Sequence, residues 1–139
     1  MKILLTGATG YIAQRLLPVL LQDGHDVVCC VRDRNRFNAQ KYTGKKVTVI
    51  EVNFLDRASL EKIPEDIDAA YYLVHSMAST SGDFGVLEKR SAVNFRQRME
   101  ATHVRQVIYL SGIVNETKLS EHLSSRKNVE DILGSASFN

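Results

Sequence analysis

Near its start the chain reads Lys2-Ile-Leu-Leu-Thr-Gly-Ala-Thr-Gly-Tyr-Ile-Ala13. An apolar run typical of a buried strand ends at Thr6, and an amphipathic pattern typical of a helix follows Gly10. Gly7, Gly10 and Ala13 recur at three-residue spacing across this junction. Glycine lets the backbone turn sharply and approach a ligand, and the free amides of a helix N-terminus attract anions. A plain strand-to-helix turn is the alternative, but the order of strand, turn and helix favours a site for the pyrophosphate of a dinucleotide.

The composition is that of one globular domain spanning residues 1–139. Apolar residues make up 44% of the chain and charged residues 24%, which argues against a disordered or fibrous protein. A net charge of +2 gives no reason to expect a nucleic acid or a membrane surface as partner. Met1 and Lys2 lead into an apolar run too short for a signal peptide or a membrane span. Cys29 and Cys30 are adjacent and have no second pair, so we expect buried thiols in a reducing cytoplasm.

Strand-like and helix-like segments alternate along the whole chain. Strands are expected at residues 3–5, 26–31, 47–52, 67–74 and 106–110, and helices at 11–22, 57–63, 84–102 and 120–133. Pro18 should kink the first helix and Gly24 should close it as a left-handed cap, while Asp56 and Ser120 should cap later helices. The alternation predicts an α/β fold of the Rossmann type. Its doubly wound parallel sheet has the strand order 3-2-1-4-5, and the ligand crevice lies at the carboxyl ends of the strands.

No segment after the last helix reads as a sixth strand before the chain stops at Asn139. A doubly wound dinucleotide fold places a sixth strand beside the fifth. We therefore expect the sequence to be the N-terminal part of a longer protein, truncated before strand 6 and lacking the substrate-binding part. The free edge of the fifth strand would favour self-association.

The residues after the second strand bear on the choice of cofactor. An acid there holds the ribose 2′-hydroxyl of NAD, whereas an arginine accommodates the 2′-phosphate of NADP. The basic segment at this point contains Arg32, Arg34, Arg36, Lys41, Lys45 and Lys46. Arg32 is its first polar residue, so we predict that it contacts a 2′-phosphate and that the cofactor is NADP. Asp33 could serve NAD instead, and Arg34 and Arg36 could equally belong to a solvated charged loop.

Three segments share a pattern with one known superfamily. They are Thr6-Gly7-Ala8-Thr9-Gly10-Tyr11-Ile12-Ala13, which matches a TGATGxxG/A turn, Gly24-His25-Asp26-Val27-Val28 with Val31-Arg32-Asp33, and Asn53-Phe54-Leu55-Asp56, which is similar to Asp-Leu-x-Asp. Taken together they resemble the atypical and extended short-chain dehydrogenase/reductase superfamily, close to its NmrA-like and NAD-dependent epimerase/dehydratase-like branches.

The resemblance implies a set of cofactor contacts. At the glycine-rich turn these are Gly7, Thr9, Gly10, Tyr11 and Ile12, and at the adenine they are Asn53, Phe54 and Leu55. Asn53 replaces the usual aspartate, and its amide can still donate to and accept from an adenine edge. After the fourth strand, His75 could face the nicotinamide or cap the strand.

The catalytic motif of the superfamily is altered in this chain. Its enzymes carry Ser or Thr after the fifth strand and Tyr-x-x-x-Lys on the next helix, where the lysine and the cofactor lower the pKa of the tyrosine. Ser111 fits the serine position, while His122 and Arg126 replace the tyrosine and the lysine. Histidine can exchange protons near neutral pH, whereas arginine keeps its charge and does not readily release a proton. His122 could instead be a surface residue, and Arg126 could contact the cofactor or a phosphate.

The resemblance leaves two hypotheses about function. The first is an NADP(H)-dependent oxidoreductase or epimerase/dehydratase-like enzyme for a small molecule, with Ser111 polarising an oxygen and Arg126 holding the cofactor. The second is a non-catalytic, NmrA-like protein that senses the dinucleotide, and the loss of the tyrosine favours it. The superfamily also implies a homodimer built from the helices after strands four and five. A stripe typical of core or of such an interface contains Leu87, Ser91, Phe95 and Met99.

Overall fold

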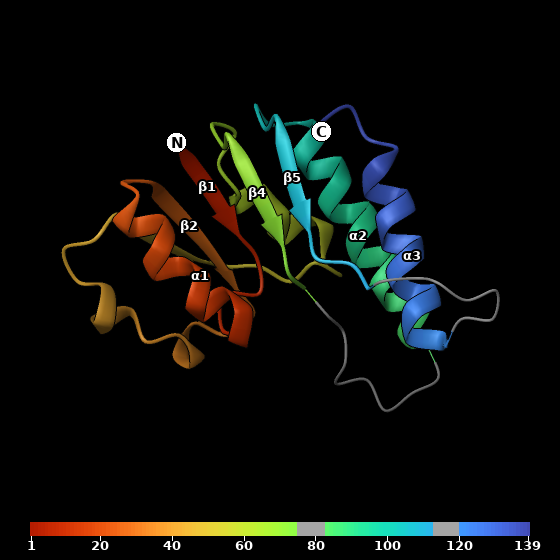
Figure 1. Cartoon of the computed structure of the whole chain (residues 1–139), viewed down its shortest axis with the longest axis horizontal. Coiled ribbons are helices and arrows are strands. Elements are labelled where there is room, and N and C mark those ends of the chain that lie inside the picture. The colour runs from red at the N-terminus through yellow and green to blue at the C-terminus, as the bar shows by residue number, and fades with distance from the viewer. Residues whose placement is uncertain (75–82, 113–119) are drawn as a thin grey trace.

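The computed structural model describes residues 1–74, 83–112 and 120–139 (Figure 1). Its centre is a parallel sheet made of β1 (Lys2–Leu5), β2 (Asp26–Val31), β3 (Val47–Glu51), β4 (Ala69–Tyr72) and β5 (Gln106–Tyr109). The helices are α1 (Tyr11–Gln22), α2 (Phe84–Glu100) and α3 (Glu121–Gly134), with short 3-10 helices η1 (Arg34–Arg36), η2 (Ala39–Tyr42) and η3 (Arg57–Lys62). The order across the sheet is β3-β2-β1-β4-β5, which confirms the predicted doubly wound topology.

Helices cover both faces of the sheet (Figure 1). On one face Ile3 and Leu5 of β1 pack with Leu17 of α1. On the other face Leu4 belongs to a core that includes Phe95 of α2 and residues of α3 and η3. Successive residues of β1 therefore point into different cores, which explains why the strands read as unbroken apolar runs. Cys29 and Cys30 are buried free thiols, and burial raises the pKa of Cys29 to about 12.

Several helices and strands have the bounds predicted from the sequence, and a few are shorter than predicted. α1 and β2 have the expected bounds, but β4 covers 69–72 instead of 67–74, α2 ends at Glu100, and the helix expected at 57–63 is the 3-10 helix η3. Ile67 is fully buried although it lies outside the β4 ladder. Apolar residues flanking a strand can thus fill the core without pairing, so hydrophobicity alone overestimates strand length.

The predicted helix ends are present. Gly24 has φ +82° directly after α1, and α1 continues through Pro18. The Asp56 side chain accepts a hydrogen bond from the Ala58 amide at the start of η3. Ser120 accepts one from the Leu123 amide at the start of α3.

The outer edge of β5 is partly paired by the end of the chain itself. The Asn139 amide donates to the Arg105 carbonyl at 3.0 Å, and the Val107 amide donates to the Asn139 carbonyl at 2.6 Å. This is the pattern of a parallel neighbour, in which one residue bonds to positions on either side of its partner. Phe138 packs against the core beside it. The expectation of a fully free edge on β5 is therefore corrected.

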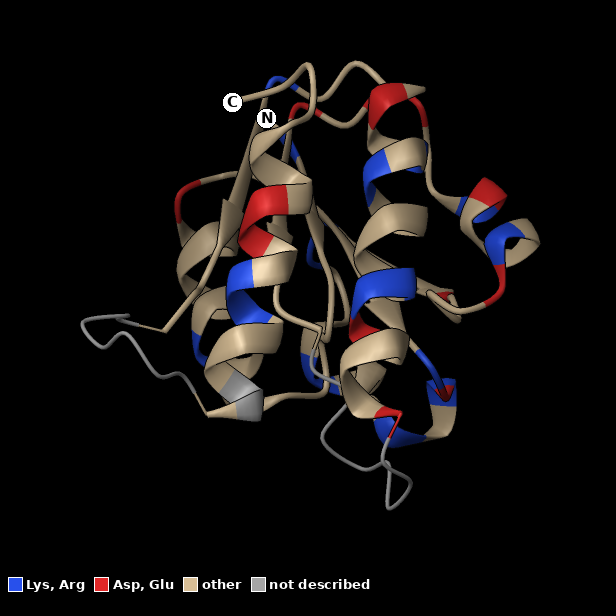
Figure 2. Cartoon of the chain, turned by 90° about the vertical axis from the view of Figure 1, so that its right-hand side faces the viewer, with Lys and Arg blue, Asp and Glu red and all other residues tan. Residues whose placement is uncertain are grey.

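The helices α2 and α3 pack side by side on one face (Figure 2). Ser91, Phe95 and Met99 are buried and Leu87 is half-buried, so the predicted stripe belongs largely to the core of this chain. Figure 2 shows acidic and basic bands on both helices. Along α3 the basic pair Arg126 and Lys127 is followed by the acidic pair Glu130 and Asp131.

Candidate dinucleotide site

The turn between β1 and α1 is held tightly against β4. The buried Thr6 hydroxyl donates to the Tyr71 carbonyl at 3.0 Å and accepts from the Leu73 amide at 2.9 Å. Gly7 follows with φ +60°, and an added Cβ would lie 2.7 Å from the Leu73 carbonyl oxygen. Only glycine meets both conditions, because L side chains disfavour this φ and the obstructing atom is backbone.

The N-terminus of α1 lies open at the end of this turn. Gly10 is the N-cap residue and therefore has no side chain that could cap the helix, and the first turn contains no acidic residue. Among the described residues, no hydrogen-bond acceptor meets the amides of Tyr11, Ile12 and Ala13. These amides and the helix dipole form an anion site of the kind the sequence predicts.

Apolar side chains are exposed along the same edge of the sheet. Tyr11 and Ile12 begin α1, Leu55 follows β3, Val86 lies in the first turn of α2, and Leu110 follows β5. Each is more than a third exposed, and Tyr11 reaches 72% with the Arg15 guanidinium 4.5 Å from its ring centre. Because the strands are parallel, all of these positions lie at the carboxyl edge. A ligand with planar rings would cover such surface.

In the segment after β2, some side chains are hydrogen-bonded within the chain and others are exposed without such a partner among the described residues. Arg34 donates from its guanidinium to the Val49 carbonyl at 2.8 Å, and its amide donates to the Glu51 carboxylate. Asp33 accepts from the Asn35 amide at 2.9 Å and thereby caps η1. Arg32 is exposed, and no described residue forms an ion pair or hydrogen bond with its guanidinium. Arg32 is therefore the first cation after β2 that is open to a ligand.

The segment after β3 is fixed by its own side chains. The Asn53 carboxamide oxygen accepts from the Leu55 amide at 3.0 Å, and Leu55 is exposed. Phe54 points into the core, where its ring contacts those of Tyr72 and Phe95. Of the three predicted adenine contacts, Asn53 and Leu55 are exposed, whereas Phe54 is buried.

Ser111 and Arg126 lie close together after β5. An added Cβ at Gly112 would lie 3.7 Å from both Cδ and Nη1 of Arg126, so the arginine side chain covers the Ser111–Gly112 backbone. The Ser111 hydroxyl donates to the Glu130 carboxylate at 3.0 Å. Arg126 therefore lies against the residue that follows Ser111, and Ser111 bonds to a carboxylate that sequence reasoning missed. His75 lies outside the described residues, and the side chain of His122, the second residue of α3, is likewise outside them.

Tyr109 is the phenol nearest to this group, and sequence reasoning did not consider it. Its hydroxyl donates weakly to the Arg126 carbonyl at 3.5 Å. Burial raises the pKa of Tyr109 to about 12, assisted by the negative charges of Glu88 and Glu130 and opposed by Arg126. An acid/base tyrosine needs a lowered pKa, so Tyr109 does not replace the missing tyrosine of the motif.

A buried carboxylate lies between α2 and α3. Glu88 is only 5% exposed, and the buried Ser125 hydroxyl donates to its carboxylate at 2.6 Å. Sequence patterning gave no sign of this pair, because Glu88 lies among charged residues of a helix that reads as amphipathic. The bond joins the two helices close to Ser111 and Arg126.

Comparison with known proteins identifies the family of this chain. The sequence profile of a family described as NAD(P)H-binding matches residues 7–135. The chain belongs to this NAD(P)H-binding family. The match begins at the β1–α1 turn and ends after α3, and it confirms the resemblance to the short-chain dehydrogenase/reductase superfamily. The uncapped amides of α1 and the crowded Gly7 fit the pyrophosphate of such a cofactor.

Individual proteins are similar to this NAD(P)H-binding chain in sequence or in fold. A segment of 66 residues is 39% identical to UDP-glucose 4-epimerase from Schizosaccharomyces pombe, covering 44% of this chain and 19% of that protein. An NADPH-dependent quinone oxidoreductase from Escherichia coli, complexed with NADPH, superposes with a TM-score of 0.75 at 21% identity, over 98% of this chain and 46% of its own.

Two solved epimerase structures are similar in the same way. UDP-glucose 4-epimerase from Bifidobacterium longum, in complex with NAD+ and UDP, gives a TM-score of 0.77 at 20% identity, over 96% of this chain and 48% of its own. A nucleoside-diphosphate-sugar epimerase from Staphylococcus aureus gives 0.81 at 16% identity, over 99% and 48%. The NAD(P)H-binding chain spans less than half the length of each of these structures.

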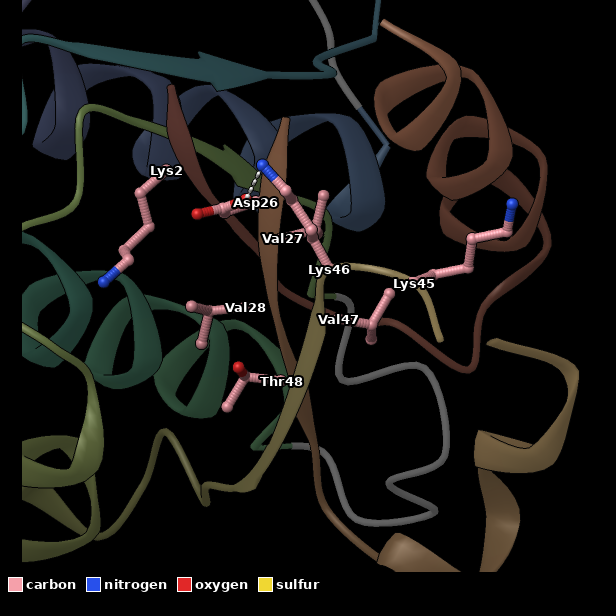
Figure 3. A pocket seen from close by; sticks show the side chains of 8 residues that line it. All are labelled: Lys2, Asp26, Val27, Val28, Lys45, Lys46, Val47 and Thr48. Atoms are coloured by element: carbon pink, nitrogen blue, oxygen red, sulfur yellow. Dashed lines mark ion pairs between the residues drawn. The ribbon is translucent and has the colours of Figure 1, made fainter. Parts of the chain in front are cut away.

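A cavity of about 420 Å³ lies at the opposite, amino edge of the sheet (Figure 3). Its lining residues are Lys2, Asp26, Val27, Val28, Lys45, Lys46, Val47 and Thr48. Two of its lysines are paired, Lys46 with Asp26 at 3.5 Å and Lys2 with Asp66 at 2.5 Å. The free amides of α1 lie at the other edge, so we do not assign the dinucleotide to this cavity.

Neither a metal site nor a membrane-spanning helix is found in the described part of the chain. Residues 1–74, 83–112 and 120–139 contain no cluster of His, Cys, Asp and Glu suited to a metal ion. Within the same ranges, no helix combines the length and the apolar character needed to span a membrane.

Proposed function

We propose that this domain binds NADP(H) across the carboxyl edge of its sheet, with the pyrophosphate at the N-terminus of α1 and the 2′-phosphate beside Arg32. The open N-terminus of α1 carries the proposal. There the Gly7 backbone contacts Leu73 so closely that no side chain fits, and the first-turn amides have no acceptor among the described residues. Backbone amides aimed at one point favour an anion over any neutral ligand.

The preference for NADP over NAD rests on Arg32 and its neighbours. A guanidinium can donate two parallel hydrogen bonds to a phosphate, and Arg32 is exposed directly after β2. Asp33, the residue that could instead hold a ribose 2′-hydroxyl, already caps η1 through the Asn35 amide. Both observations favour a 2′-phosphate at this position.

The proposed reaction is hydride transfer between the cofactor and a carbonyl or alcohol group of a small molecule. Bound NADP(H) would supply or accept the hydride. The Ser111 hydroxyl would then donate its hydrogen bond to the substrate oxygen instead of to Glu130. Arg126 would place a positive charge beside that oxygen. His122 is proposed to exchange the proton of the substrate oxygen, since it replaces the tyrosine of the motif.

A second candidate is a non-catalytic protein that senses the dinucleotide. Two observations favour it. The Ser111 hydroxyl already donates to Glu130, and the raised pKa of Tyr109 keeps that phenol protonated at neutral pH. Neither group is then prepared for proton transfer, while the α1 turn would still bind the cofactor.

Cofactor preference is tested by titrating the domain with NADPH and NADH before and after Arg32→Ala. We expect the affinity for NADPH to fall about tenfold or more and that for NADH to change little, because a charge-assisted hydrogen bond is lost only with the phosphate. Arg105→Ala is the matched control, since Arg105 carries the same charge at the amino edge. An unchanged NADPH/NADH ratio in Arg32→Ala would contradict the assignment.

Turnover separates the two candidate functions. Oxidation of NADPH by a panel of aldehydes, ketones and quinones that is lost in His122→Phe and in Ser111→Ala supports the enzyme. Tight binding of NADPH without turnover, unaffected by either substitution, supports the sensor.

A further inference from the structure

The order of the sheet predicts where the base of the dinucleotide lies. The proposed pyrophosphate site is at the end of β1, and the proposed 2′-phosphate contact follows β2. The next strand outward is β3, which pairs with β2 along its whole length. A dinucleotide that runs from the first strand to the second therefore places its base over residues 52–55, where Leu55 exposes an apolar side chain.

The polar side chain at this position is Asn53, and its hydrogen bonds determine what it can offer. The carboxamide oxygen accepts from the Leu55 amide at 3.0 Å. Because an amide N–H can only donate, this contact identifies the oxygen and the nitrogen of the carboxamide. The oxygen is thus engaged within the turn. The exposed Nδ2 group, which carries two donors, meets no acceptor among the described residues.

Neighbouring residues hold the turn in this arrangement. The Ser59 hydroxyl accepts from the Asn53 amide at 2.9 Å and donates to the Asn53 carbonyl at 2.8 Å. From α2, the Asn94 side chain donates to the Phe54 carbonyl at 2.8 Å. The backbone on both sides of the Asn53 side chain is therefore fixed, and the side chain cannot exchange its oxygen for its nitrogen without breaking the Leu55 contact.

We infer that Asn53 recognises the base as a hydrogen-bond donor, so that the site accepts a 6-oxopurine dinucleotide about as well as the adenine one. This inference rests on the proposed function. Adenine offers an acceptor at N1 beside its 6-amino donor, and hypoxanthine offers an acceptor at O6 beside its N1–H donor. An Nδ2 donor therefore finds an acceptor on either base.

The test compares two probes, NADPH and its reduced hypoxanthine analogue, by calorimetric titration of the whole chain. In the unsubstituted chain we expect dissociation constants within about threefold of each other, because one donor serves both bases. Asn53→Leu should weaken the binding of both probes by about fivefold and leave their ratio unchanged, because it removes the one donor that serves both bases. Asn128→Leu on α3 makes the same chemical change on an exposed helix position and should leave both affinities unchanged.

The outcomes separate a failure of this inference from a failure of the proposed function on which it rests. Near-equal binding of both probes, together with a similar loss of affinity for both in Asn53→Leu, supports the inference. Binding of both probes with a preference of tenfold or more for adenine in the unsubstituted chain overturns the inference alone. The same holds if Asn53→Leu leaves both affinities unchanged or weakens the binding of only one probe. Failure of both probes to bind overturns the proposed function and the inference with it.

Discussion

The helices α1 and α3 both begin at the carboxyl edge of the sheet, yet their N-termini are treated differently. α1 begins after Gly10, which has no side chain to cap the helix. α3 begins after Ser120, whose hydroxyl accepts from the Leu123 amide. First-turn amides can serve the protein's own cap or an external anion, and a cap uses up part of that capacity. Of the two helices, α1 is therefore the one whose N-terminus is open to a phosphate.

The segments that precede the two helices differ in the same sense. The β1–α1 turn is fixed by the Thr6 hydroxyl and by the close approach of Gly7 to Leu73. After β5, Ser111 instead directs its proton to Glu130. One half of the edge is rigid and open, while the polar groups of the other half are paired with each other.

The largest effect is expected for Gly7→Ala. The left-handed φ and the contact with the Leu73 carbonyl together should lower the free energy of unfolding by about 3 kcal/mol and abolish NADPH binding. Gly24→Ala is the matched control, because Gly24 also has a positive φ but has open space around it. Its cost should be about 1 kcal/mol, with NADPH affinity unchanged. Urea unfolding and NADPH titration measure both, and equal behaviour of the two variants would refute the close-contact argument.

Gly10→Ser gives α1 the kind of cap that α3 already has. The backbone of Gly10 is extended, as an N-cap serine requires, although a Cβ would lie 3.1 Å from the Gly7 carbonyl oxygen. The added hydroxyl should occupy first-turn amides and weaken NADPH binding by about tenfold, while the free energy of unfolding changes by no more than about 1 kcal/mol. Titration with NADPH and urea unfolding separate the two effects. Undiminished affinity would show that these amides do not bind the phosphate.

Ser120→Ala removes the cap from α3 and is the reverse of the change made to α1 by Gly10→Ser. Loss of one cap should lower the free energy of unfolding by about 1 kcal/mol. NADPH affinity should stay within about twofold, because α3 is not the helix proposed to hold the pyrophosphate. A clear loss of NADPH affinity in this variant would mean that both helices contact the cofactor.

Much of the rigid half could be predicted from the sequence, since its signals are local. The spacing of Gly7 and Gly10 marks the turn in the sequence, although the contacts that fix it come from the end of β4, and the apolar strands indicate burial on both faces. The other half depends on contacts between distant residues. Ser111 meets Glu130, and Glu88 meets Ser125, across 19 and 37 positions of sequence. No short-range pattern marks such pairs, because they are created by the packing of α3 beside the end of β5 and against α2.

The donor-only role of Asn53 also depends on contacts that the sequence does not reveal. The sequence leaves an asparagine free to donate or to accept. The choice is made by the Leu55 amide two residues later, and that contact requires the turn that Ser59 and Asn94 stabilise. The residue was predictable from the sequence, whereas its hydrogen-bonding polarity required the structure.

The smallest effect is expected for Tyr109→Phe near neutral pH, where the 3.5 Å hydrogen bond to the Arg126 carbonyl contributes little. At alkaline pH the two proteins should diverge. The phenol ionises near its ordinary pKa of 10 in the unfolded chain but only near 12 in the folded one, so the unfolded state binds fewer protons between these values. The stability that Tyr109 contributes is therefore complete below pH 10 and is lost as the pH rises towards 12.

Urea unfolding of both proteins from pH 7 to 11 measures this divergence, and Cys29, which is present in both, cancels from the difference. Tyrosinate absorbance of the folded chain supplies a second reading, in which Tyr109→Phe should remove a phenol that titrates late. A stability difference that stays constant with pH would mean that Tyr109 ionises as in water. The paired half of the edge would then hold a phenol able to exchange a proton, and the case for a non-catalytic domain would weaken.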